Sequence, residues 1–119
     1  MDINVFLKSV IEQDKEPVVI CNTSDTIIYM NSAAVIRYAK RGGAVLIGRN
    51  LLECHNDNSR AVIKKITLGF EKGQGNDTVF TYHNPKENTD VYMVALRDEN
   101  GRYIGYYEKH ESRSAETEK

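Results

Sequence analysis

The chain has 119 residues, of which 40% are hydrophobic and 28% are charged, and its formal net charge is −1. This length and composition are typical of one globular domain with a modest core. The near balance of charge gives no reason to expect nucleic acid or an anionic membrane surface as a partner. The sequence has no apolar run close to the roughly 20 residues that a membrane span requires, and its start does not resemble a signal peptide. Two cysteines, Cys21 and Cys54, are too few for a disulfide framework, so we expect a cytoplasmic protein of bacterial type with reduced thiols.

A helix is predicted over residues 2–13. Asp2 can cap it, and apolar residues recur at the spacing of one helix face: Ile3, Phe6, Leu7, Val10 and Ile11. Because a helix this short is marginal alone, it must pack on something. Two interpretations stay open. Either the helix covers one face of the domain, with Val5 an isolated exposed residue on its other side, or it packs against a second copy of itself.

Two β-rich runs follow, at residues 18–21 and 26–30, with polar turn residues between them. Such a pair predicts a β-hairpin. Asn31 or Ser32 can cap the next helix, which is expected to continue to about Lys40 because small and apolar residues suited to close packing fill it.

The longest helix is predicted from Arg60 to about Lys72, after a run of capping residues at 56–59. Three further strands are expected at 78–83, 90–97 and 103–110, with a tight turn at Asn100-Gly101 between the last two. This order favours an α+β fold, in which helices gather on one face of a five-stranded antiparallel sheet. We divide the chain into an N-terminal amphipathic helix at 1–15, a folded domain at 16–110 and a flexible tail at 111–119.

The sequence resembles PAS domains over about residues 16–110. Three segments carry the resemblance: Asp25-Thr26-Ile27-Ile28-Tyr29-Met30-Asn31-Ser32-Ala33-Ala34, Gly48-Arg49-Asn50-Leu51-Leu52 and Asp98-Glu99-Asn100-Gly101-Arg102-Tyr103-Ile104-Gly105. The resemblance implies a sheet of strand order 2-1-5-4-3 and a sensory or regulatory module of signal transduction that binds a small molecule or a protein partner. The Cys54-His55 pair is similar to a bacterial PAS subgroup, some of whose members are attached to hemerythrin-like domains.

His55 is the residue most open to a functional interpretation, because it precedes the longest helix, where heme-binding PAS domains place an axial ligand. That helix itself contains no histidine, and the alternatives are a metal site with Cys54 or a pocket-lining imidazole bonded to the backbone or to Ser59. Cys54 lacks the arginine and glutamine that accompany the reactive cysteine of flavin-binding light sensors. The sequence therefore favours neither heme nor flavin and leaves the cofactor unknown. It shows no catalytic arrangement, so we expect no enzymatic activity.

Two sets of residues follow from these placements. A pocket for a small organic ligand between the helices and the concave sheet is predicted to be lined by Ile28, Met30, Ile36, Leu52, His55, Ile63, Ile66, Val79 and Met93. A homodimer interface is predicted at Ile3, Val5, Phe6 and Val10, against an outer sheet face rich in tyrosine. The alternative function is a ligand-free scaffold for dimerisation or for a signalling partner.

Overall fold

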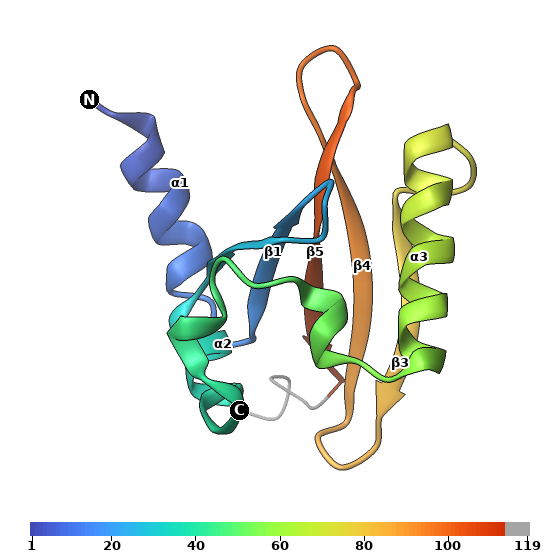
Figure 1. Ribbon diagram of the computed structural model, residues 1–119. Coiled ribbons are helices and arrows are strands. Elements are labelled where there is room, and N and C mark those ends of the chain that lie inside the picture. Colours follow the sequence, from blue (N-terminus) through green and yellow to red (C-terminus); the bar gives the residue numbers. More distant parts are fainter. Residues whose placement is uncertain (114–119) are drawn as a thin grey trace.

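Within residues 1–113, which the computed structural model describes, five antiparallel strands form one sheet of order β2-β1-β5-β4-β3 (Figure 1). The strand order and the α+β class are as predicted from the sequence. The strands are β1 (Val18–Asn22), β2 (Ile27–Met30), β3 (Thr78–Asn84), β4 (Thr89–Arg97) and β5 (Tyr103–Ser112). The α-helices are α1 (Ile3–Glu12), α2 (Ser32–Arg37) and α3 (Asp57–Lys72). Short 3-10 helices lie at Ala39–Arg41, Gly43–Leu46 and Leu51–Cys54.

Side-chain caps set where the helices begin. The side chain of Asp2 accepts a hydrogen bond from the backbone of Asn4 at the start of α1, as predicted. Asn31, not Ser32, caps α2. Asn56 caps α3, which therefore begins at Asp57, three residues before the predicted start.

Two predicted element ends were wrong. The helix that was expected to reach about Lys40 ends at Arg37, and the chain continues in 3-10 turns that pass through Gly42 and Gly43, both at positive φ. The backbone at these glycines is one that other residues rarely adopt. At the C-terminal side, β5 continues to Ser112 and so includes two residues assigned to the tail. The rest of that predicted tail, from residue 114, lies outside the described residues.

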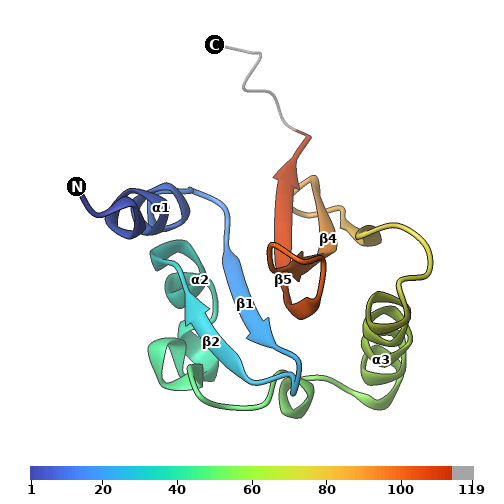
Figure 2. The ribbon, with the colours of Figure 1, turned by 90° about the horizontal axis from the view of Figure 1, so that it is seen from above.

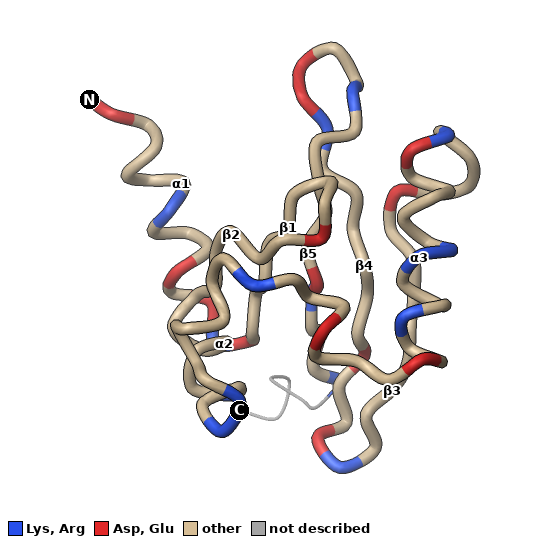
Figure 3. The backbone as a smooth tube through the Cα atoms, in the orientation of Figure 1, with Lys and Arg blue, Asp and Glu red and all other residues tan. Residues whose placement is uncertain are grey.

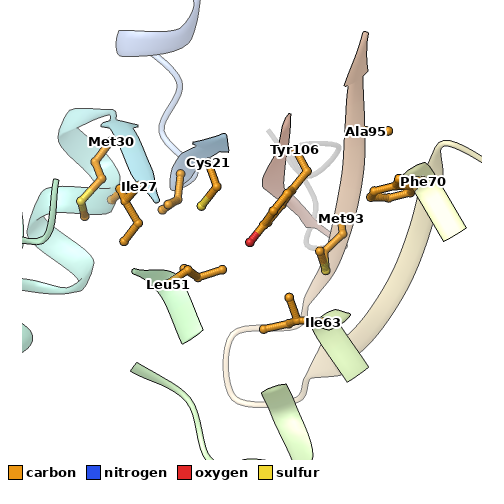
Figure 4. Packing of buried hydrophobic residues seen from close by; sticks show 11 residues of the cluster. Cys21, Ile27, Met30, Leu51, Ile63, Phe70, Met93, Ala95 and Tyr106 are labelled. Atoms are coloured by element: carbon orange, nitrogen blue, oxygen red, sulfur yellow. The ribbon is translucent and has the colours of Figure 1, made fainter. Parts of the chain in front are cut away.

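The core lies between the concave face of the sheet and the segment from the 3-10 helix at Leu51–Cys54 through α3. Figure 4 shows Leu51 and Ile63 facing strand residues that include Cys21, Met93 and Tyr106. On β4, alternate residues are buried, as the period-two pattern predicted: Val91, Met93 and Ala95.

A buried carboxylate joins three elements at the β1–β2 turn. Asp25 is 3% exposed and has φ 64°, a left-handed conformation that aspartate tolerates better than most residues. Its Oδ1 accepts a hydrogen bond of 2.9 Å from Tyr106 Oη, and its Oδ2 lies 2.7 Å from Lys64 Nζ. The sequence predicted Asp25 as a turn residue only. In the fold it also anchors the turn to β5 and α3.

Replacing Tyr106 with Phe should lower the free energy of unfolding by about 1 kcal/mol, because it removes one hydrogen bond from a buried carboxylate that keeps its lysine partner. Urea denaturation measures this loss. Tyr107→Phe is the control, since Tyr107 alternates to the other sheet face and we expect a change below about 0.5 kcal/mol. Equal losses in the two variants would contradict the anchoring role of Tyr106.

The helix α1 lies at one side of the molecule, beside α2 and opposite α3 (Figures 1 and 2). None of its residues is buried, and Ile3, Phe6, Leu7 and Val10 are each more than half exposed. The interpretation that this apolar face covers the domain is therefore wrong.

Contacts at its C-terminal end hold α1 to the domain. The Glu12 carboxylate accepts hydrogen bonds from Tyr29 Oη and from the Ser32 hydroxyl, and the Ser32 amide lies 3.1 Å from it. These bonds keep the pKa of Glu12 below its usual value, the bond from Ser32 contributing most. The amide of Asn31 adds bonds to the carbonyl oxygens of Ile11, Asp14 and Glu16, at 3.0, 3.3 and 3.0 Å. The helix is thus fixed at one end while its apolar face stays uncovered.

Charged positions of both signs are distributed over the helices, strands and loops, as the near-zero net charge requires (Figure 3). Among residues 1–113, none of the helices has the length and apolar character needed to cross a membrane.

Candidate functional site

A cleft of about 1660 Å³ opens on the concave side of the sheet. Its floor comes from β1, β4 and β5, and its walls come from α2, from the segment 54–59 and from the first turns of α3. The linker between α1 and β1, residues 13–17, lies along its edge. The cleft thus reaches from the core of the domain to the base of the N-terminal helix.

The floor of the cleft carries one carboxylate among apolar residues. Glu108 lies on β5, in register with Val19 of β1 and Met93 of β4, and all three line the cleft. Burial raises the pKa of Glu108 above its usual value, and the positive charges of His55 and Arg37 oppose this shift. Within the described part of the chain, the Glu108 carboxylate forms no hydrogen bond and no ion pair.

Two tyrosines stand near this carboxylate. Tyr38 follows α2 and Tyr82 lies on β3, and both line the cleft. Burial raises the pKa of Tyr38 to about 12, and the negative charge of Glu108 contributes to the rise. The same two causes raise the pKa of Tyr82. Both phenols therefore stay neutral at physiological pH and present aromatic surface and hydroxyl groups to the cleft.

The arginine at the cleft wall already has a partner. Arg37 Nη1 lies 2.7 and 2.8 Å from the two carboxylate oxygens of Glu87, and its guanidinium carbon is 6.0 Å from the centre of the Tyr38 ring. Such a charge-assisted pair fixes the guanidinium in place. Arg37 and Glu87 thus form a charge-balanced wall.

His55 lines the cleft, and its Nδ1 lies 2.9 Å from the carbonyl oxygen of Leu51. Of the two partners that the sequence left open for a pocket-lining imidazole, the backbone and Ser59, the structure shows a backbone contact. In this contact Nδ1 donates to the carbonyl oxygen. Cys54 also lines the cleft. Over residues 1–113, no group of three or more His, Cys, Asp and Glu side chains is arranged to hold a metal ion.

The structure brings five of the nine predicted pocket residues to the cleft: Met30, Ile36, His55, Ile63 and Met93. The other four lie elsewhere. Ile28 is 53% exposed because the register between β1 and β2 shifts beside it, so that Ile27 takes the inward position. Leu52 packs against the core cluster, and Ile66 and Val79 line a smaller hollow on another side of α3.

Apart from His55, sequence reasoning missed the polar groups of the cleft. Glu108 could have been found, because Tyr106, Glu108 and His110 alternate along β5 and must share one sheet face. Tyr38 and Tyr82 carry no such signal, since the first follows a short helix and the second lies beyond a register shift between β3 and β4.

The sequence matches no protein-family model, and a search of curated proteins found no significant match. Solved structures do match. The chain is similar to a C-terminal domain from Streptococcus mutans, with a TM-score of 0.73 and 20% identity over 94% of this chain and 85% of that one. It is similar to the PAS domain of Bordetella pertussis BvgS, with a TM-score of 0.66 and 13% identity over 99% of this chain and 91% of that domain. It is also similar to a sensory box sensor histidine kinase from Vibrio cholerae, with a TM-score of 0.64 and 13% identity over 95% of this chain and 94% of that one.

The strand order and the helices over the concave face are those of the PAS domains that this chain resembles in structure. This chain has the fold of a PAS domain, as the sequence motifs predicted. Its resemblance to the hemerythrin-associated subgroup stays a prediction.

Proposed function

We propose that this chain is a non-enzymatic sensory module that binds a small organic molecule in the cleft. The observation that carries the proposal is the extent of the cleft, which joins the sheet floor to the linker at the base of α1. The similarity to the sensor histidine kinase of Vibrio cholerae supports a role in signalling. A small molecule in the cleft would contact both the core and the element that carries the exposed apolar helix face.

Ligand binding acts in this proposal by shifting a population. The C-terminal end of α1 is held by Glu12 and by the Asn31 amide. A ligand that contacts residues 13–17 changes the relative free energy of two orientations of α1, provided that it binds one of them more tightly. The proposed output is therefore the position of α1.

We further propose that α1 pairs with a second copy of the chain. Its exposed face holds Ile3, Phe6 and Val10, while Val5 adds apolar surface at 64% exposure. The outer face of the sheet is a second apolar surface, where the rings of Phe80 and Tyr92 lie 5.8 Å apart, edge to face. Apolar surfaces of this kind commonly mark interaction sites.

Native mass spectrometry with an absorption spectrum of the same sample tests the ligand proposal. We expect added mass that is lost on denaturation. A Soret or flavin band would identify a heme or a flavin in place of an uncoloured molecule. A bare chain, with a melting temperature unchanged across a metabolite panel, would contradict ligand binding and favour the ligand-free scaffold.

Replacing Phe6 with Asp should convert the proposed dimer to a monomer, because a carboxylate cannot be buried unpaired in an apolar interface. Light scattering measures the mass. Val45→Asp is the matched control, since Val45 is 68% exposed but lies outside the proposed interface. A wild-type mass in the Phe6 variant, or a monomeric wild type, would overturn the proposed interface.

A further inference from the structure

Glu108 is an unusual feature of the cleft, because its side chain is partly withdrawn from water and has no hydrogen-bond or ion-pair partner within residues 1–113. It is flanked in register by Val19 and Met93, and Ile63 also lines the cleft. Removing a carboxylate from water without a hydrogen bond or a counter-ion is unfavourable. In the described residues the chain itself supplies neither, and the open cleft leaves room for a ligand that does.

Two of the three lysine and arginine side chains along the cleft, Arg37 and Arg41, are engaged by other groups. Arg37 is paired with both oxygens of Glu87, and Arg41 donates to the carbonyl oxygen of Cys54 at 3.1 Å. His55 is oriented by its contact with Leu51. Within residues 1–113, neither these arginines nor His55 forms a hydrogen bond or ion pair with Glu108, although His55 and Arg37 are close enough to influence it electrostatically.

The lining of the cleft as a whole carries more negative than positive side chains. Five carboxylates line the cleft against three lysine and arginine side chains; these are Glu12, Asp14, Glu16, Glu87 and Glu108 against Lys15, Arg37 and Arg41. Tyr38 and Tyr82 add aromatic rings near Glu108, and the faces of such rings attract cations. Met30 and Ile63 provide apolar contact for the rest of a ligand.

We propose that the ligand of this cleft is a small organic amine, whose protonated nitrogen pairs with Glu108 and whose apolar part lies against the sheet floor. This inference rests on the proposed ligand-binding function and names the chemical class of the ligand. The nitrogen gives the carboxylate its missing partner, and the tyrosines stand beside the resulting ion pair. An anionic ligand would place a second negative charge near Glu108.

Calorimetric titration with three probes tests the proposal. Each probe carries a phenyl ring: phenethylamine is cationic, 2-phenylethanol is neutral and phenylacetate is anionic. We expect the amine to bind at least about 10-fold more tightly than either of the others, the usual effect of one hydrogen bond between charged groups. Glu108→Gln keeps the shape of the side chain and removes its charge, and it should weaken amine binding by about the same factor. Glu111→Gln is the matched control, since Glu111 lies on the same strand and pairs with Lys109 outside the cleft.

The outcomes separate this inference from the function on which it rests. Equal binding of the three probes to the wild-type chain, or tighter binding of phenylacetate, would overturn the amine and leave a ligand cleft in place. Unchanged amine affinity in a folded Glu108→Gln variant would overturn the role of Glu108. If no probe binds and the native mass spectrum shows only the bare chain, both the inference and the ligand-binding function fail.

Discussion

Replacing Asn31 with Ala should lower the free energy of unfolding by about 3 kcal/mol. Asn31 has no exposed surface, and its Oδ1 accepts hydrogen bonds of 2.9 Å from the amides of Val18 and Ala34. Its Nδ2 donates to three carbonyl oxygens at and beyond the end of α1. Alanine would remove the cap of α2 and every hydrogen bond that this side chain makes to β1, to α1 and to the linker. Against a typical stability of about 5–15 kcal/mol, this is a large loss.

Asn56→Ala is the matched control. Asn56 caps α3 by accepting from the Ser59 amide at 2.9 Å, but it is exposed, and within residues 1–113 its side chain forms no hydrogen bond to a distant segment. We expect the free energy of unfolding of that variant to fall by about 1 kcal/mol, the usual contribution of a cap. Urea denaturation measures both, and hydrogen exchange of residues 3–12 should rise in the Asn31 variant only. Equal losses would mean that Asn31 acts as a cap and not as a link to α1.

The hydrogen bonds of Asn31 show what local sequence patterns can and cannot predict. The cap was predicted as either Asn31 or Ser32, because a capping residue before a small-residue helix is a local signal. The bonds to Ile11 and Glu16 were not, because they depend on how α1 approaches the sheet. The strand order was predicted only through the resemblance to PAS domains, whereas the alternation of β4 follows from the residues themselves.

The candidate site was predicted less completely than the fold, for two physical reasons. A one-residue shift in the pairing of β1 with β2 moved Ile28 outward, and pairing registers are not visible in composition or spacing. Apart from His55, the predicted pocket lining also consisted of apolar residues alone. Glu108 was therefore missed, although its position on β5 between two residues of the same sheet face, Tyr106 and His110, implies that it points toward the helices.

A connection between the cleft and α1 follows from these contacts. Ser32, on the cleft wall, donates to Glu12, and the neighbouring Asn31 bonds to the linker that borders the cleft. A ligand that displaces this corner must alter the bonds that hold α1. Weakening of the Asn31 bonds should therefore change the orientation of α1 even without a ligand.

Replacing Gly105 with Ala should destabilise the fold by at least about 4 kcal/mol, the range reached when the backbone itself must move. Gly105 lies within β5, opposite Asn22 of β1 and Leu96 of β4, and its φ is 154°. A Cβ atom there would lie 2.2 Å from the carbonyl oxygen of Cys21 and 3.1 Å from the Cα of Asn22. Both are backbone atoms of the adjacent strand, so no side chain can rotate to make room. The variant must open the β1–β5 pairing in the centre of the sheet.

Gly101→Ala distinguishes this clash from a general effect of losing glycine. Gly101 lies in the turn before β5 with φ 82°, and a Cβ there would meet no atom within 4 Å. The free energy of unfolding of this variant should therefore fall only by the cost of a left-handed backbone conformation, about 1 kcal/mol. Urea denaturation of both variants, with circular dichroism to detect loss of sheet, provides the comparison. If Gly105→Ala unfolds at the same urea concentration as Gly101→Ala, β5 does not approach β1 as closely as the structure places it. The position of Glu108 in the cleft floor, three residues along the same strand, would then have to be revised.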